Sequence, residues 1–436
     1  MTLTEKEAPA ADAPLQPDTP EVVEEGNPMR VVQLVVGLLV ITGIFIALGW
    51  GNLLLFIAIL FAIVMLHEFG HFVTAKRAGM KATEFFVGFG PRLWSVRKGE
   101  TEYGVKAIPA GGYVRIVGFT STEEVAEEDE ARAYRQKPFH SRIIVASAGS
   151  AMHFLIAFVL ALILVLAVGQ TTNNLKVGSI DTWARGATPA ALAGLKPGDV
   201  IVSVNGKAPD SATAVTDTIA KNTGKQIDLG VERDGKLIHL EATPQSGKGL
   251  SIKGQKLDDH GYLGFAPSGY ATQSVSTLAA PGAALSMMWQ VTRETASGVG
   301  QLFSPHGLTS IAHQVTNSKA GASAADNPGS APRACSIVCV ANVGSQSESL
   351  GLYALLSFLI AINIGFGIFN MLPMIPLDGG HVAIAAYEWI RTKKGQPYYR
   401  ADITKLMPVA TAFVAFLLVF VAASVYLDIA HPIQLH

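Results

Sequence analysis

Two histidines four residues apart, with a glutamate directly after the first, are the side chains of this sequence that most directly predict chemistry. They are His67, Glu68 and His71 in the pentapeptide HEFGH. On a helix, residues four apart lie on one face about one turn apart, so both imidazoles can bind one zinc ion. The glutamate is placed to take a proton from a metal-bound water. The pattern predicts zinc-dependent hydrolysis with Glu68 as the catalytic residue.

The position of this motif favours a metal site over its structural alternative. The same five-residue pattern occurs by chance on exposed helices, where the glutamate forms salt bridges. Here the motif closes an apolar run that begins at Leu53. Ionisable groups within a membrane span are costly unless they are paired or metal-bound, so the zinc site is the preferred interpretation.

A third ligand is expected from the segment NMLPMIPLDGGH, residues 370–381. Catalytic zinc usually takes three protein ligands and keeps a fourth position for water. Asp378 is the best candidate. His381 competes with it by chemistry alone, or supports another ligand, or simply begins the next helix. The prolines and paired glycines predict irregular backbone, which at membrane depth must line protein or a water-filled cavity.

The composition and four apolar runs predict a polytopic α-helical membrane protein. The chain of 436 residues is 49% hydrophobic and only 15% charged, beyond what soluble domains usually show. A helix needs about 20 residues to cross the hydrocarbon core. The net charge of -1 gives no indication of a nucleic-acid partner. The four certain spans are expected at Leu53–Ala75, Ile143–Val168, Leu352–Leu372 and Leu406–Leu427.

The first 49 residues divide into a tail and a fifth apolar run. Residues 1–30 are rich in Ala, Pro, Glu and Asp and are expected to be disordered. Val31–Leu48 is of borderline length, and Ala47-Leu48-Gly49 resembles a signal-peptide cleavage site. A signal peptide starts with a short basic region, whereas this tail is long and acidic. An additional, retained N-terminal span over residues 31–49 is therefore favoured.

Lys and Arg residues next to the spans predict the orientation of the chain. They are concentrated between the first two certain spans and between the last two. Both segments are therefore expected in the cytoplasm, together with the end of the span that carries His71. The stretch 170–350 is then expected outside.

Residues 174–245 have the strands and turns of a small β-rich domain. Four short β-branched runs, Val177–Ile180, Asp199–Val204, Ile227–Glu232 and Leu237–Ala242, are separated by turn signals that include Asn205-Gly206 and Asp234-Gly235. The segment AALAGLKPGDVI, residues 190–201, resembles the helix and turn of protease-associated PDZ domains. Such a domain binds extended peptides at a sheet edge; the alternative is that it only excludes large substrates.

The flanking segments are interpreted as a linker and a small sheet. In the extracytoplasmic linker, residues 246–350, Ala283–Leu302 predicts an amphipathic helix and residues 304–334 a mobile loop. Cys335 and Cys339, the only cysteines, either pair or remain buried thiols. Near the membrane, residues 85–117 predict a short antiparallel sheet with a turn at Lys98-Gly99, whose edge must be covered or used.

These motifs together resemble the site-2 protease family of intramembrane zinc metalloproteases, in particular its RseP-like branch with one PDZ domain. The resemblance runs from about Leu53 to the C-terminus and rests on HEFGH at 67–71, VGFGP at 87–91, GGYV at 111–114, the PDZ-like segment and NMLPMIPLDGGH at 370–381. It implies that residues 52–170 and 351–430 form the two halves of a catalytic core. It also implies that Asp378, rather than His381, completes the site of one zinc ion.

The resemblance further implies how substrates bind and which proteins they are. The sheet at 85–117 would pair with an unwound substrate helix, with Asn370, Gly88, Gly90 and Gly112 as the substrate-binding residues. Implied substrates are single-span proteins of the lipid bilayer, such as anti-sigma factors or signal-peptide remnants, already shortened outside by a site-1-type protease. The implied location is the plasma membrane of a bacterial cell.

Two residues, Ser150 and His153, depart from the family pattern, and two other function classes stay open. The family usually shows Ala-Gly-Pro-x-x-Asn where this chain has AGSAMH at 148–153. His153 can contact the metal, titrate, or hydrogen-bond another helix, and the last is favoured. A metal transporter would carry ligands along a path through the membrane. A catalytically inactive PDZ scaffold would typically have lost Glu68 or a ligand.

Overall fold

The computed structural model describes residues 28–119, 123–183, 186–210, 213–249, 251–252, 255–256, 259–317, 320, 336, 339–340, 343, 352–393 and 399–431. They belong to two compact units. The first unit contains the residues up to Met152 together with Asn370–Leu417, and the second contains His153–Phe369 and the residues from Leu418 onward.

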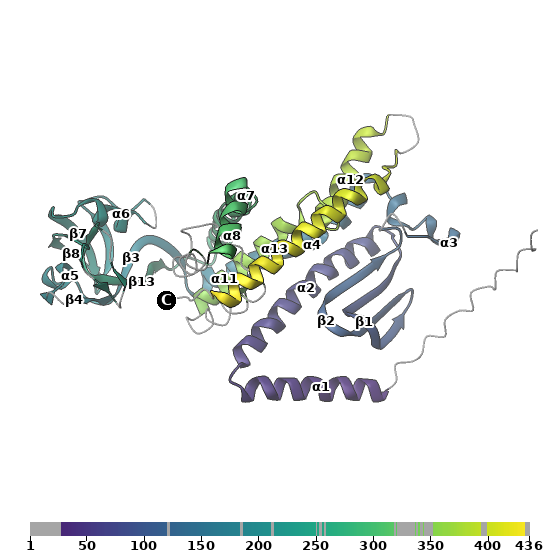
Figure 1. Ribbon diagram of the computed structural model, residues 1–436, viewed down its shortest axis with the longest axis horizontal. Helices are drawn as coiled ribbons and strands as arrows, with labels where there is room; N and C mark the ends of the chain where they lie inside the picture. The colour runs from purple at the N-terminus through teal and green to yellow at the C-terminus, as the bar shows by residue number, and fades with distance from the viewer. Residues whose placement is uncertain are drawn as a thin grey trace, which may run out of the picture. The chain divides into compact units, whose positions relative to one another are not determined.

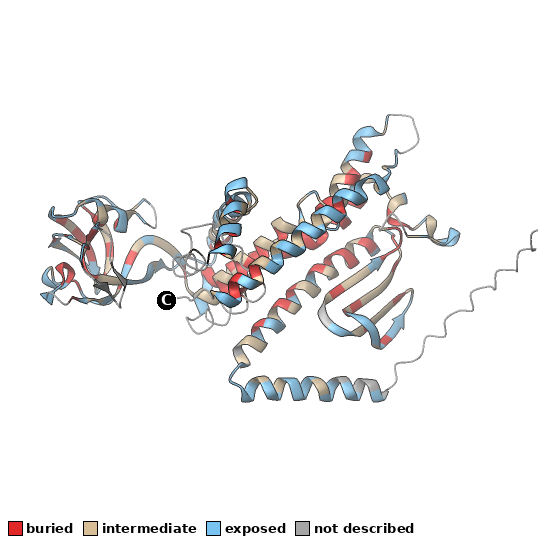
Figure 2. Cartoon of the chain, viewed as in Figure 1, coloured by how far each residue is buried: buried red, intermediate tan, exposed pale blue. Residues whose placement is uncertain are grey.

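Four helices of the described residues are long and apolar enough to cross a membrane, which confirms the four predicted spans by length and composition. They are α2 (Gly51–Arg77), α4 (Phe139–Ala167), α11 (Leu352–Asn370) and α13 (Met407–Ala430). Figure 2 shows exposed residues, in pale blue, along α13. Large apolar side chains are among them, for example Leu418 and Val419 at 67% and 71% exposure. Such a surface is stable in contact with lipid rather than with water. The chain is therefore a multi-pass membrane protein.

The predicted N-terminal span forms α1 (Pro28–Ala47). Its described apolar part, Val35–Ala47, is shorter than the other four spans. The crossing of the membrane by α1 stays a prediction, and the tail before Pro28 lies outside the described residues.

The juxtamembrane sheet of the first unit is one long, folded hairpin that lies beside α2 (Figure 1). Strand β1 (Ala82–Lys98) pairs antiparallel with β2 (Thr101–Ile116) through the predicted turn, where Gly99 has φ 65°. Phe85 faces both Tyr103 and Val114, because the second half of β2 folds back along the first half of β1. The remaining elements of this unit are α3 (Glu127–Glu130), the 3-10 turn η1 (Tyr134–Gln136), α12 (Asp378–Arg391) and the 3-10 turn η2 (Ile403–Leu406).

The β-rich domain of the second unit contains the predicted strands. Its five-stranded sheet has the order β13-β3-β6-β7-β8. Asn205 and Asp234 adopt positive φ, as two-residue turns require. The turn at Asp234 joins β7 to β8, and the turn at Asn205 joins Val204 to its bridge partner Lys207. Buried Val177, Ile201 and Leu229 are part of its hydrophobic core. The bounds are β3 (Gln170–Ile180), β4 (Thr182–Trp183), β5 (Gly186–Ala187), α5 (Pro189–Leu192), β6 (Val200–Val204), α6 (Ala214–Lys221), β7 (Ile227–Arg233), β8 (Lys236–Ala242), β9 (Gln245–Ser246), β10 (Ser251–Ile252), β11 (Gln255–Lys256), β12 (Gly261–Tyr262) and β13 (Phe265–Gln273).

The buried carboxylate of Asp199 connects the loop that precedes β6 to strand β7 of the sheet. Asp199 is 1% exposed and accepts hydrogen bonds from Lys196 N at 2.8 Å and from Arg233 Nε and Nη2 at 2.7 and 2.6 Å. Burial alone would raise the pKa of Asp199, but the guanidinium of Arg233 and the Lys196 N–H lower it below its usual value. The ionised form is therefore the one that stabilises the fold.

The stability of this domain is expected to depend on Asp199 ionisation. Because the folded pKa is lowered, the contribution is complete above the unfolded pKa of about 3.9 and is lost as the pH falls through the folded value. Asp199→Asn should reduce the opening free energy of β6 and β7 at pH 7 by about 2 kcal/mol. The variant should also show a smaller fall in the opening free energy as the pH is lowered from 6 to 3. Hydrogen exchange of the full-length protein between pH 6 and pH 3 measures both; exposed Asp217→Asn is the control, and an unchanged fall in Asp199→Asn would contradict the assignment.

Two helices follow the β-rich domain. The predicted amphipathic helix is α7 (Ala280–Leu302), whose Ala284 and Met288 pack with Leu164 of α4 and Ile360 of α11. The prediction of a mobile loop over 304–334 was wrong for its first part, because Pro305–Thr316 forms helix α8. Ser304 caps this helix by accepting a hydrogen bond from Gly307 N at 3.0 Å, and Pro305 occupies its first turn. Cys339 is disulfide-bonded, and Cys335 lies outside the described residues.

Candidate metal centre

Three ligand atoms from two distant segments come together in the first unit. The Nε2 atoms of His67 and His71 are 3.3 Å apart, and Asp378 Oδ2 lies 3.4 Å from the first and 3.3 Å from the second. Both imidazoles are buried, at 8% and 5% exposure. Among the described His, Cys, Asp and Glu residues, these three bring their ligand atoms close enough together to hold one metal ion.

The spacing of these atoms fits a zinc ion. Three atoms separated by 3.3 to 3.4 Å share a point about 1.9 Å from each, close to the usual zinc–nitrogen and zinc–oxygen distances of about 2.0 to 2.1 Å. Asp378 Oδ2 is buried and accepts no hydrogen bond within the described part of the chain. A buried carboxylate oxygen without a donor is costly unless a cation binds it, so the donor set suits a metal.

A backbone carbonyl of α4 orients one of the imidazoles. His71 Nδ1 lies 2.7 Å from Val145 O, which can only accept a hydrogen bond. The proton is therefore on Nδ1, and the lone pair of Nε2 faces the other two ligand atoms. This is the usual way in which proteins fix the tautomer of a metal-binding histidine.

Gly149 of α4 leaves the space in which the two imidazoles meet. A Cβ atom at this position would lie less than 3.0 Å from atoms of both His67 and His71. A second glycine, Gly70 of α2, also faces α4, because a Cβ atom at Gly70 would lie 2.7 Å from Ala148 O. Gly149 was not predicted to have a function; its signal was the AGS stretch at 148–150, which belongs to the family pattern.

Two glycines let the chain reach the third ligand. Asp378 is the first residue of α12, where a carboxylate also interacts favourably with the helix dipole. A Cβ at Gly379 would clash with the carbonyls of Met371 and Leu372, and one at Gly380 would lie 2.8 Å from Ile375 N. The close backbone approach predicted for this segment is confirmed.

The position of Glu68 beside the imidazoles depends on the sheet. The backbone N–H of Val114 in β2 donates to the Glu68 carboxylate. In the same strand, a Cβ at Gly112 would lie less than 3.0 Å from the sulfur of Met65, so this glycine permits β2 to lie against α2. Strand β2 therefore contacts α2 at two places, at Met65 and at the predicted catalytic residue Glu68.

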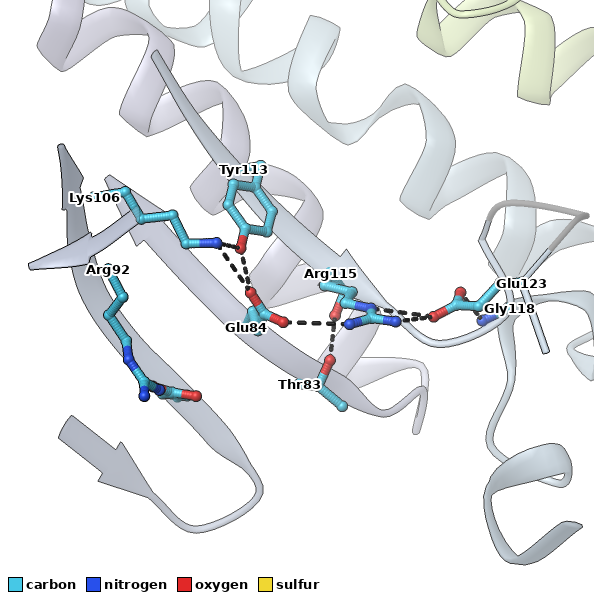
Figure 3. Close-up of polar contacts among 9 residues, drawn as sticks. Thr83, Glu84, Arg92, Lys106, Tyr113, Arg115, Gly118 and Glu123 are labelled. Atoms are coloured by element: carbon cyan, nitrogen blue, oxygen red, sulfur yellow. Dashed lines mark hydrogen bonds and ion pairs between the residues drawn. The ribbon is translucent and has the colours of Figure 1, made fainter. Parts of the chain in front are cut away.

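A polar cluster on the sheet holds this strand in place (Figure 3). Tyr113 donates a hydrogen bond to Glu84 of β1, and Lys106 donates to Tyr113. Arg115 Nη1 lies 3.3 Å from Glu84 Oε1, and its Nη2 lies 3.2 Å from Glu123 Oε1. The carboxylate of Glu84 therefore ties both halves of β2 to β1, next to Val114.

His381 and His153, the two other candidate histidines, occupy different surroundings. His381 packs against Phe119, with ring centroids 4.2 Å apart, and does not belong to the ligand group of described residues. Burial lowers the pKa of His381 to about 4, so this imidazole is neutral at physiological pH. In the second unit, His153 Nδ1 lies 3.2 Å from Asn363 Oδ1 of α11, which is the helix-to-helix hydrogen bond that was favoured.

Three of the four predicted substrate-binding residues lie at bends or ends of elements, whereas Gly112 lies within β2. Asn370 is the last residue of α11 and is half-buried. Gly88 and Gly90 have φ 85° and 83°, which only glycine adopts easily, and they interrupt the regular pairing of β1. Their contact with substrate stays a prediction.

Comparison with known proteins identifies relatives along most of the chain. The sequence profile of Peptidase family M50 matches residues 55–417. The zinc metalloprotease Rip1 of Mycobacterium tuberculosis (strain H37Rv) is 30% identical over 414 residues, covering 88% of this chain and 98% of the relative. Rip1 of Mycolicibacterium smegmatis is 31% identical over 415 residues (89% and 99%), and the metalloprotease MmpA of Caulobacter vibrioides 28% over 383 residues (80% and 90%).

Proposed function

This chain belongs to peptidase family M50, the site-2-type zinc metalloendopeptidases, and from that premise we propose that it cuts peptide bonds within or next to the membrane span of single-span proteins. One observation carries the proposal. The two imidazoles that meet Asp378 Oδ2 belong to α2, within its membrane-spanning stretch Leu53–Arg77. A hydrolytic site on such a helix acts on substrates that are themselves in the membrane.

We assign the ligands and the proton transfers to residues of the first unit. His67, His71 and Asp378 hold the zinc ion, which when bound supplies activation of a water molecule and polarisation of the scissile carbonyl. Glu68 accepts the proton of that water and afterwards donates it to the leaving amine. The hydrogen bond from Val114 N–H holds the carboxylate in place for both transfers.

The sheet next to α2 is assigned to substrate positioning. A peptide bond in a helix is shielded, so the substrate has to be unwound before a water molecule can attack it. An unwound segment has free backbone donors and acceptors, and a β-sheet edge satisfies them. We assign this role to residues 85–117 with Gly88, Gly90 and Gly112, and to Asn370 at the end of α11.

The remaining parts are assigned to substrate selection. Residues 174–245 form the PDZ domain, which binds a new peptide terminus or excludes large extracytoplasmic domains. Residues 246–350 connect it to the second half of the catalytic core. The positively charged segments next to the spans support a cytoplasmic active site and an extracytoplasmic PDZ domain in a bacterial plasma membrane. Substrates would then reach the enzyme after a site-1-type protease has shortened them.

The function is tested by mapping the cut in a tagged single-span protein. Purified enzyme in lipid nanodiscs is incubated with the substrate, and the new termini are identified by mass spectrometry. The expected cut lies within the span or its border. Chelation should abolish cleavage, and stoichiometric zinc should restore it while magnesium does not. Cuts confined to the soluble parts of the substrate, or cleavage that survives chelation, would refute the proposal.

A further inference from the structure

A buried ion pair joins α12, which carries the ligand Asp378, to α4, which lies against the two imidazoles of α2. Arg142 Nη1 of α4 lies 2.5 Å from Glu388 Oε2 of α12, and the side chains are 5% and 4% exposed. The guanidinium also lies 5.1 Å from the centroid of the Tyr134 ring, and Glu388 Oε1 accepts a hydrogen bond from Ala401 N at 2.8 Å. Both charged groups are thus held on more than one side.

On α4, the ion pair and the metal centre share one helix face. Arg142 precedes Val145 by three residues and Gly149 by seven, a spacing that places all three on one stripe. Val145 O fixes His71, and Gly149 lies against both imidazoles. The stretch of α4 that shapes the histidine half of the site is therefore the stretch that Arg142 anchors.

On α12, a matching stripe leads from the ion pair to the third ligand. Asp378, His381, Ala385 and Glu388 follow one another at spacings of three, four and three residues, and Ala385 and Glu388 are buried. Trp389 next to Glu388 stacks on Phe139 of α4 with ring centroids 5.0 Å apart. The ion pair and this ring contact therefore both join the end of α12 to α4.

Net stabilisation alone does not account for a buried ion pair at this place. Removing two charges from water offsets much of their attraction, and apolar replacements of such pairs are often equally stable. The best-attested use of buried ionic groups is to fix the register of packed elements. A slip of one residue along a helix moves an atom by about 1.5 Å, which the distances of 3.3 and 3.4 Å between Asp378 Oδ2 and the imidazoles would not tolerate.

We propose that the Arg142–Glu388 pair is a positioning element of the metal centre, which sets the register of α12 against α4 and so brings Asp378 to His67 and His71. The proposal rests on the ligand set assigned under the proposed function. Both residues act through other side chains, so neither is a catalytic residue.

Zinc affinity of the purified full-length protein, measured by competition with a chelator of known affinity, tests the proposal. Glu388→Gln and the apolar double variant Arg142→Met/Glu388→Met are compared with wild type, and helix content is followed by circular dichroism. We expect both to bind zinc at least about tenfold more weakly, as for other groups that orient ligands, with unchanged helix content. The double variant leaves no unpaired buried charge, so it covers the case in which Glu388→Gln fails to fold.

Two further variants make the outcome specific. Glu100→Gln breaks the more exposed Arg132–Glu100 pair, which has two hydrogen bonds of 2.6 and 2.9 Å in the same unit, and should leave zinc affinity unchanged. Asp378→Asn tests the ligand set itself. If Asp378→Asn weakens zinc binding and the folded double variant binds zinc like wild type, the positioning role is overturned and the proposed function stands. If Asp378→Asn has no effect, the ligand assignment fails, and the positioning role with it.

Discussion

Glu68→Gln is expected to reduce peptide hydrolysis by about 10³-fold, the usual contribution of a general acid and base that acts in both proton transfers. Glutamine keeps the shape of the side chain and can still accept the hydrogen bond from Val114 N–H. It cannot take a proton from water, however. The proton therefore has no acceptor at the position next to His67, and the leaving amine has no donor.

The variant separates chemistry from metal binding. Because Glu68 is outside the group formed by His67, His71 and Asp378, zinc content should equal that of wild type. Cleavage is measured by co-expression with a tagged single-span substrate and by single-turnover assays of the purified enzyme. Exposed Glu127→Gln on α3 is the matched control and should cleave like wild type. Turnover by Glu68→Gln within tenfold of wild type would show that another group serves as the base.

The sequence alone was sufficient where side-chain type and local spacing carry the information. Two imidazoles and a carboxylate at fixed helix spacing identify one half of the site, and an apolar run of span length identifies its helix. The proline and glycine pattern marked residues 370–381 as the source of the third ligand, and the family resemblance favoured Asp378 over His381 within it. The turns at Asn205 and Asp234 were predicted because their positive φ selects few residue types.

The parts that escaped prediction depend on contacts between distant segments. The carbonyl of Val145 orients His71, and a carbonyl has no residue signature. Arg142 was counted only as a charge that sets topology, since nothing in the sequence indicates that it meets Glu388, which lies 246 positions later. Helix α8 was missed because the small polar residues after it dominate the composition, although Ser304 and Pro305 are a normal helix start.

Gly149→Ala is expected to weaken zinc binding by about 100-fold and to abolish cleavage in consequence. The added Cβ would lie less than 3.0 Å from atoms of both imidazoles, where nonbonded carbon atoms normally keep about 3.5 to 4.0 Å. Relief requires either rotation of the imidazoles or separation of α2 from α4. Either movement spreads the three ligand atoms beyond the spacing that one ion can bridge.

This effect differs from ordinary loss of a helix glycine, because alanine is the better helix former by about 1 kcal/mol. Gly43→Ala in α1 is the matched control, since a Cβ there meets nothing within 4 Å, and it should leave both zinc and cleavage unchanged. Zinc affinity and cleavage are measured on the same preparations. A Gly149→Ala enzyme that binds zinc like wild type would show that α4 does not approach His67 and His71 so closely, and the ligand geometry would have to be revised. Gly149→Ala removes no functional group, because glycine has no side chain. A loss of zinc in this variant therefore results from the filled space between α2 and α4, and that space is where the active site has to form.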